Sequence, residues 1–172
     1  MTLTMYKALS ELWRRSFHEP IKDIMRSRMI EWRSQPAVVR VDKPTKLHTA
    51  RKLGYKAKRG FIVVRVRVRK GSGEKPRPRS GRRPKALGVK KIKREISKEE
   101  IAVYRAQRKY PNLKPIGCYY VYEDGMYEWY EVIMVDPMIV LKDRKISVQL
   151  PGPTTRRFIR RIEELEEVNL PK

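Results

Sequence analysis

Apolar residues near the start of the chain recur at helical spacing and predict two helices. The repeat between Met5 and Phe17 predicts the first helix. Pro20 opens the second and Pro36 ends it, because proline is tolerated in the first turn of a helix but not in its interior. One face of this second helix is expected to carry Ile21, Ile24, Met25, Arg28, Met29 and Trp32.

Two strands follow these helices. Residues 37–41 (AVVRV) predict a short strand, and a basic connection with a possible helical turn ending at Gly54 comes next. Residues 61–69 alternate with a period of two and are rich in β-branched types, which predicts a second strand. Side chains of a strand alternate between its faces, so one face carries Val64, Val66 and Val68 and the other carries Arg65, Arg67 and Arg69.

The second half of the chain predicts a helix over residues 98–110. Ser97 with Glu100 three residues later has the spacing of a capping box, which marks a helix start. The face of this helix is expected to include Ile101, Tyr104 and Arg105.

A β-hairpin is predicted over residues 115–137, where Asp124-Gly125 suits a type I′ turn. Its strands carry an aromatic run that is expected to pack mainly into the core, with one face available to RNA or protein: Tyr119, Tyr120, Tyr122, Tyr127, Trp129 and Tyr130. Residues 154–168 can form a terminal helix with Phe158, Ile162 and Leu165 aligned.

The net charge of the chain adds a functional prediction to this predicted fold. Lys and Arg number 42 against 19 Asp and Glu in 172 residues, a formal net charge of +23. From Arg40 to Arg94 there are 22 basic residues and two acids, so this segment holds 20 of the 23 excess charges (22 minus 2). Such a segment is typical of a surface that binds a polyanion, and a strongly anionic partner is expected.

The arginines of residues 61–69 allow two interpretations. A strand repeat sets their guanidinium groups about 7 Å apart, which suits successive phosphates, but a solvated strand face gives the same alternation. Two neighbouring features favour phosphate binding. No acid alternates with the arginines along the strand, and residues 70–94 continue the positive charge in a segment too polar to fold alone. We expect this loop to be disordered in free solution and to order on RNA, although a flexible linker is the alternative interpretation.

Tyr55 lies among lysines and an arginine, so it can stack a base or close the edge of the core. The RNA-recognition-motif signature needs Gly or Ala and then an aromatic after Phe61, and Ile62 and Val63 stand there instead. That fold is excluded.

No catalytic or metal-binding set is recognisable. His18 and His48 have no partner by motif, Cys118 lies in an apolar strand, and no zinc-ligand spacing, Walker loop or dinucleotide fingerprint occurs. We therefore expect no enzyme activity, no cofactor, no metal and no small-molecule substrate. The one cysteine indicates a reducing compartment, and no signal peptide or membrane-spanning stretch is predicted.

Two long blocks resemble one protein family. The block IEWRSQPAVVRVDKPTKLHTARKLGYKAKRGFIVVRVRVRKGSG, and KYPNL followed by YYVYEDGMYEWYEVIMVDP, resemble the archaeal and eukaryotic large-subunit ribosomal protein fifteen-e family, in an archaeal style. The resemblance runs from about Tyr6 to Pro137. It implies a single α+β domain over residues 1–172, with helices packed on an antiparallel sheet and a basic loop at 70–94 that orders on RNA.

The function implied by the resemblance is structural. The chain would bind large-subunit ribosomal RNA and neighbouring ribosomal proteins in the cytoplasmic ribosome. By position, the resemblance implies RNA contacts at Arg33, Arg40, Lys46, Arg51, Lys52, Tyr55, Lys56, Lys58, Arg59, Arg65, Arg67, Arg69, Lys70, Lys75, Arg77, Arg79, Arg82, Arg83, Lys85, Lys90, Lys91, Lys93 and Arg94.

Residues 138–172 depart from the family pattern and end in an acidic stretch that contains Glu163, Glu164, Glu166 and Glu167. These glutamates would repel phosphate, so this divergent extension is expected at the surface or against a basic partner. The rival functions are a free-standing RNA-processing or RNA-modifying enzyme with a basic docking arm, and a DNA-compacting protein.

Overall fold

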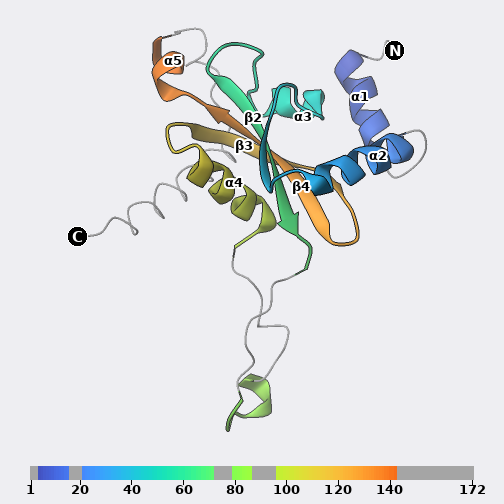
Figure 1. Ribbon diagram of the computed structural model, residues 1–172, viewed down its shortest axis with the longest axis vertical. Helices are drawn as coiled ribbons and strands as arrows, with labels where there is room; N and C mark the ends of the chain where they lie inside the picture. Colours follow the sequence, from blue (N-terminus) through green and yellow to red (C-terminus); the bar gives the residue numbers. More distant parts are fainter. Residues whose placement is uncertain (1–3, 16–20, 72–78, 87–95, 143–172) are drawn as a thin grey trace.

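A computed structural model gives the fold of the protein, and the residues that it describes are 4–15, 21–71, 79–86 and 96–142 (Figure 1). Within these ranges, strands β1 (Val38–Val41), β2 (Phe61–Arg69), β3 (Lys114–Glu123) and β4 (Tyr127–Val135) form one antiparallel sheet in the order β1-β2-β4-β3. Helices pack on this sheet, so the predicted α+β class is confirmed. The predicted terminal helix at 154–168 and most of the predicted loop at 70–94 lie outside the described residues.

Strand β2 is central because it pairs with β1 on one side and β4 on the other. Its bounds agree with the predicted strand, and its register runs from Phe61 opposite Val135 to Arg69 opposite Tyr127. The two faces also alternate as predicted, with Val64, Val66 and Val68 buried together on one of them.

Each face of the sheet has its own hydrophobic core. On one face, Met25, Met29 and Trp32 of α2 (Ile21–Ser34) pack against the sheet, and Trp32 meets Trp129 edge-on at 5.9 Å between ring centroids. On the other face, α4 (Lys98–Lys109) covers the β2 valines and the β4 residues Val132 and Met134. Because helices cover both faces of the sheet, each face of β2 is shielded from solvent along at least part of the strand.

Two predicted helix faces need correction. Met25, Met29 and Trp32 of α2 are buried as expected, but Ile24 is 52% exposed. In α4 the buried residues are Ala102, Val103 and Ala106, whereas Tyr104, which was predicted on the packing face, is 56% exposed. Small residues allow α4 to lie close to the sheet, so the larger Tyr104 points away from it.

The capping box of α4 is confirmed. The Ser97 hydroxyl accepts a hydrogen bond from the Glu100 amide, and the Glu100 carboxylate accepts one from the Ser97 amide. These two bonds satisfy backbone donors that a helix start leaves unpaired.

The hairpin between β3 and β4 is confirmed, but its predicted type I′ turn is wrong. That turn needs positive φ at both central residues, and the described glycines with positive φ are Gly54, Gly60, Gly71 and Gly81. The turn is closed instead by Asp124, whose side chain accepts hydrogen bonds from the amides of Met126 and Tyr127.

The remaining helices are α1 (Met5–Arg14), α3 (Leu47–Lys52), the short 3-10 helix η1 (Pro84–Ala86) and α5 (Pro137–Lys142). Helix α3 confirms the helical turn expected before Gly54. Helix α5 was not predicted. It is tied to the loop before β2, because the Asp136 amide donates to the Gly60 carbonyl at 2.8 Å and Ile139 lies against Gly60, whose φ is +90°.

No helix in the described part of the chain has both the length and the apolar character needed to cross a bilayer.

Candidate nucleic-acid interface

The arginine row of β2 begins inside the protein. Arg65 is only 9% exposed, its guanidinium carbon lies 4.0 Å from the centroid of the Trp32 ring, and its Nη2 donates to Gln35 Oε1 at 2.6 Å. Burial lowers the pKa of Arg65, and the nearby carboxylates of Glu131 and Glu31 oppose that shift. In this conformation Arg65 is covered by α2 and packs as an internal cation.

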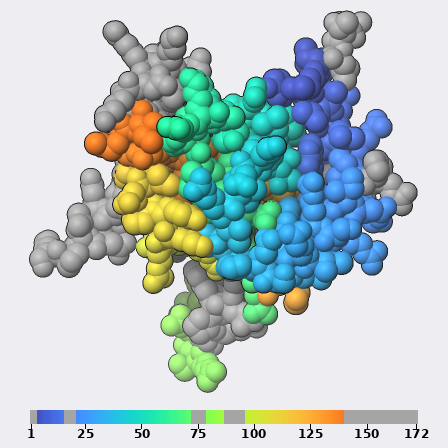
Figure 2. Space-filling view, turned by 45° about the horizontal axis from the view of Figure 1, so that its top comes forward, coloured from blue at the N-terminus to red at the C-terminus, as the bar shows by residue number. Residues whose placement is uncertain are grey.

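Exposure increases along the strand toward its end. Arg67 is half-buried, donates to the Arg33 carbonyl at 2.6 Å and lies over the Tyr127 ring at 4.7 Å, whereas Arg69 is exposed. Figure 2 shows the blue atoms of α2 beside the cyan atoms around α3 on one face of the molecule. Of the three arginines, Arg69 has the open position that phosphate contact requires.

Glu131 on β4 lies opposite Arg65 and is the carboxylate that the strand alternation did not reveal. It is fully buried, and it accepts hydrogen bonds from the Thr45 amide at 2.9 Å, the Thr45 hydroxyl and the Tyr119 hydroxyl. Burial, with the charge of Glu131 and the hydrogen bond to it, raises the pKa of Tyr119. Through its two hydrogen bonds with Thr45, Glu131 holds the segment just before α3 against the centre of the sheet.

Lys46 follows Thr45 and is held in the same region. Its Nζ donates to the Tyr120 carbonyl at 3.1 Å and lies 4.9 Å from the centroid of the Trp13 ring. Burial lowers the pKa of Lys46 from 10.5 to about 8, and the negative charge of Glu131 limits the decrease. Lys46, just before α3, therefore contacts both α1 and β3. Its contact with RNA stays a prediction.

The lowered pKa gives a pH-dependent stability. Between pH 8 and 10.5 the unfolded chain binds more protons at Lys46 than the folded chain, so the free energy of unfolding is expected to rise with pH in that window. After allowance for solvent screening, the rise between pH 8 and 9.5 should be about 1 kcal/mol. Urea unfolding at several pH values measures it. Lys46→Met should abolish the rise and Lys43→Met, at an exposed lysine, should retain it; equal slopes in all three proteins would contradict the assignment.

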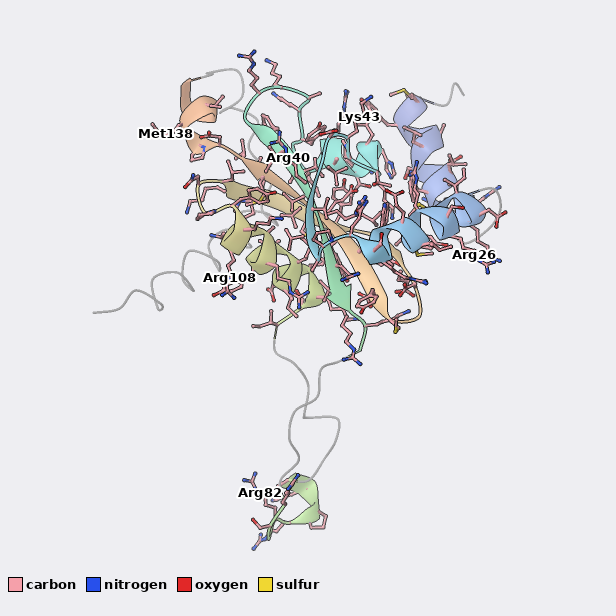
Figure 3. All side chains as sticks on the ribbon, viewed as in Figure 1. Arg26, Arg40, Lys43, Arg82, Arg108 and Met138 are labelled. Carbon is pink, nitrogen blue, oxygen red and sulfur yellow. The ribbon has the colours of Figure 1, made fainter. Side chains whose placement is uncertain are left out.

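Exposed cations gather around α3 and the loop that follows it. We call Arg51, Lys52, Lys58 and Arg59 the α3-edge group; all four are exposed, and Lys56 between them is half-buried. Arg51 also donates to the Tyr6 hydroxyl, with its guanidinium 5.5 Å from the centroid of that ring, and so connects the group to α1. Two further cations, Arg40 and Lys43, are exposed as well and are labelled in Figure 3.

Tyr55 lies at the edge of the core. It is half-buried, it packs against the cluster under α2, and its ring meets Phe61 edge-on at 6.4 Å. These contacts agree with the second of the two interpretations of Tyr55, closure of the core, and they leave its stacking on RNA a prediction.

Acids near the end of β2 are paired with predicted site residues. Arg33 Nε lies 2.7 Å from Asp124 Oδ2, and Lys70 Nζ lies 2.7 Å from Glu123 Oε1. Burial alone would raise the pKa of Asp124, but hydrogen bonds from two turn amides and from Arg33 make the net shift downward. The internal pairs reduce the negative charge that an approaching phosphate would meet.

Beyond Lys70 and Gly71, the predicted basic loop is described only around η1. Arg79, Arg82, Arg83 and Lys85 are exposed there, and Figure 1 shows η1 away from the sheet. The other predicted loop residues, Lys75, Arg77, Lys90, Lys91, Lys93 and Arg94, lie outside the described residues.

The described residues contain no group of three or more acids, histidines and cysteines that could hold a metal ion. Burial, then the charges of Lys52 and Lys46, lower the pKa of His48, and burial raises the pKa of the Cys118 thiol well above its usual value. A neutral histidine among lysines and a protonated thiol fit structural positions better than catalytic ones.

Sequence reasoning missed several surface cations. Arg105, Arg108 and Lys109 of α4 are exposed, as is Lys43 before α3. The RNA-contact residues were predicted mainly between Arg40 and Arg94, where basic residues are most frequent, and α4 lies outside that segment. The spacing of Arg105 and Arg108 on one helix was the available signal.

Comparison with known protein families gives a match over most of the chain. The family model described as Ribosomal L15 matches residues 4–160 of the chain. The match extends past Pro137, where the resemblance was expected to end, and so includes α5 and much of the segment that follows it.

Proposed function

Because the chain belongs to the L15e family of large-subunit ribosomal proteins, we propose that it binds large-subunit ribosomal RNA and stabilises its folded form. The family is a component of cytoplasmic ribosomes, and its members associate with ribosomal RNA and with other ribosomal proteins. The finer proposal concerns which surface of this chain meets the RNA. We assign that contact to the α3-edge group, to Arg40 and Arg69, and to the basic loop around η1.

The observation that carries this assignment is the exposure of the α3-edge group on the outside of the sheet domain. The acids Glu131, Asp124 and Glu123 are engaged by cationic or hydrogen-bonding partners within the protein. Arginine forks and lysine ammonium groups on such a surface suit a phosphate backbone, and ordered counterions released from RNA would favour the association.

The core of the protein supports the segment that carries the α3-edge group. The sheet and its two cores hold α3 through Ala50, which is fully buried, and through the Thr45 bonds to Glu131. The exposed cations at the α3 edge are therefore presented from a supported segment, which lowers the entropy lost when RNA binds.

Sucrose-gradient fractionation of cells that express the tagged full chain tests the proposal. We expect the chain to co-migrate with the large subunit at a stoichiometry near one, and to be released together with RNA-bound proteins at high salt. Free or substoichiometric protein with catalytic turnover on RNA would instead support the processing enzyme and contradict the proposal.

A further inference from the structure

Tyr104 is the one exposed aromatic residue in the part of the chain that the structure describes. It is 56% exposed, whereas the other described aromatic side chains are buried or half-buried. Its position on α4 is two residues from both Ala102 and Ala106, which are fully buried against the sheet. Two residues of an α-helix correspond to a rotation of about 200°, so the Tyr104 side chain points away from the sheet.

Cations occupy the same surface of α4. Arg108 lies one turn after Tyr104 and is exposed, and Figure 3 shows it at the outside of the helix. Arg105 and Lys109 are also exposed. On the sheet, Arg40 pairs with Val64, whose side chain faces α4, so Arg40 lies on the same face as α4 and extends the positive charge toward β1.

Two hydrogen bonds hold this helix in place. Arg105 Nη1 donates to the Arg67 carbonyl at 2.7 Å, and Lys109 Nζ donates to the Val38 carbonyl at 2.8 Å. These bonds join α4 to β2 and to the start of β1. Tyr104 and Arg108 are therefore carried by a supported helix, and little backbone order has to be gained when a ligand binds.

The acids of α4 lie at its other end. Glu99 and Glu100 are in the first turn, and the Glu100 carboxylate is engaged in the capping box with Ser97. Lys98 in the same turn is paired with Glu128 of β4. An anion would therefore approach Tyr104 from the carboxyl end of the helix, where Arg105, Arg108 and Lys109 lie.

We propose that Tyr104 stacks an unpaired RNA base while Arg108 contacts the adjacent phosphate. This inference rests on the proposed function and adds a second contact surface, on the face of the sheet opposite α2. The nucleic-acid occupant is favoured over a protein because the exposed Tyr104 ring and the exposed Arg108 lie one helical turn apart on α4, and because a base can stack on the ring while its phosphate meets a guanidinium.

Photo-crosslinking tests the position of the base. The full chain is irradiated with a ten-nucleotide single-stranded RNA that contains 5-bromouridine, and the crosslinked peptides are identified by mass spectrometry. We expect a crosslink at Tyr104, its loss in Tyr104→Ala and its retention in Tyr104→Trp. Crosslinks confined to other segments would overturn the proposal.

Affinity measurements supply the second readout. Against a ten-nucleotide adenosine strand, Tyr104→Ala is expected to lose about 5-fold in affinity or more, with no loss against an abasic strand of the same length. Arg108→Ala should weaken binding to both strands and reduce the slope of log K against log salt by about one. Met126→Ala, at a residue 60% exposed on the hairpin, is the control and should change neither.

The outcomes separate this inference from the proposed function. If the wild-type chain binds large-subunit RNA with a steep salt dependence but Tyr104→Ala binds both strands like the wild type, stacking is overturned and the proposed function stands. If the wild-type chain shows no salt-dependent RNA binding, the proposed function itself is contradicted, and the inference that rests on it is contradicted with it. If Tyr104→Ala weakens only the association with other ribosomal proteins, the surface docks a protein and the inference is wrong.

Discussion

Replacing Glu131 with alanine is expected to lower the free energy of unfolding by about 3–5 kcal/mol, the range found when one partner of a buried charged network is removed. The carboxylate is fully buried and accepts three hydrogen bonds, two from Thr45 and one from Tyr119. Its loss leaves these donors without an acceptor, removes the negative charge near the half-buried Lys46, and leaves the buried Arg65 with Glu31 as its remaining nearby carboxylate. Urea denaturation followed by circular dichroism measures the change.

Two further variants make the result specific. Glu131→Gln retains one acceptor oxygen and should have an intermediate effect, because the charge is lost but part of the hydrogen bonding remains. Glu11→Ala, at an exposed glutamate of α1, should change stability by less than about 0.5 kcal/mol. A loss below about 1 kcal/mol for Glu131→Ala would show that the network does not support the fold as described.

Removing Lys52, Lys58 and Arg59 together is expected to weaken binding to large-subunit RNA by about 10- to 100-fold at 0.15 M salt, if each contact contributes up to about 1 kcal/mol. The slope of log K against log salt should become shallower by about 2 to 3, because each lost phosphate contact removes about 0.7 to 0.9. Filter binding over a range of salt concentrations gives both values. Arg51 is left intact because it also contacts Tyr6 of α1.

The matched control removes the same residue types from another surface. Lys7, Lys22 and Arg26 are exposed on α1 and α2, and their replacement by alanine lowers the net charge by the same three units, from +23 to +20. We expect a clearly smaller loss of affinity in the control. Equal losses in the two triple variants would mean that overall charge, rather than the α3 edge, determines binding.

Local sequence signals predicted most of the framework. The strand β2 was recognisable because it is rich in β-branched residues that alternate with arginines from Val64 to Arg69, and α4 because Ser97 and Glu100 have capping-box spacing. Helix α2 was bounded by its prolines. These features depend on residues close in sequence, so no knowledge of the tertiary fold was needed to find them.

Features that depend on distant residues were missed or misplaced. The arginine row was predicted to face outward, but Arg65 is covered by Trp32 of α2 and lies opposite Glu131, from a strand far along the chain. Tyr104 was predicted from helical spacing to share a face with Ile101 and Arg105, whereas the close approach of α4 to the sheet selected Ala102 and Ala106 for burial. Similarly, α5 is stabilised by the contact of Asp136 with Gly60, which sequence periodicity does not reveal.

The functional surface was only partly predictable for the same reason. Charge density along the chain identified the region from Arg40 to Arg94, and the α3-edge group lies exposed within it. The cations on α4 were missed because they are few in sequence and come together with Arg40 only in the folded sheet.

The salt dependence of RNA binding tests the central claim most directly. The full chain is titrated against large-subunit ribosomal RNA and, in parallel, against duplex DNA of similar length. If about ten phosphates are contacted, log K should fall against log salt with a slope near −7 to −9, and binding to the ribosomal RNA should be the tighter at every salt concentration. A flat salt response, or equal affinity for duplex DNA, would contradict the assignment of this chain as a ribosomal RNA-binding protein.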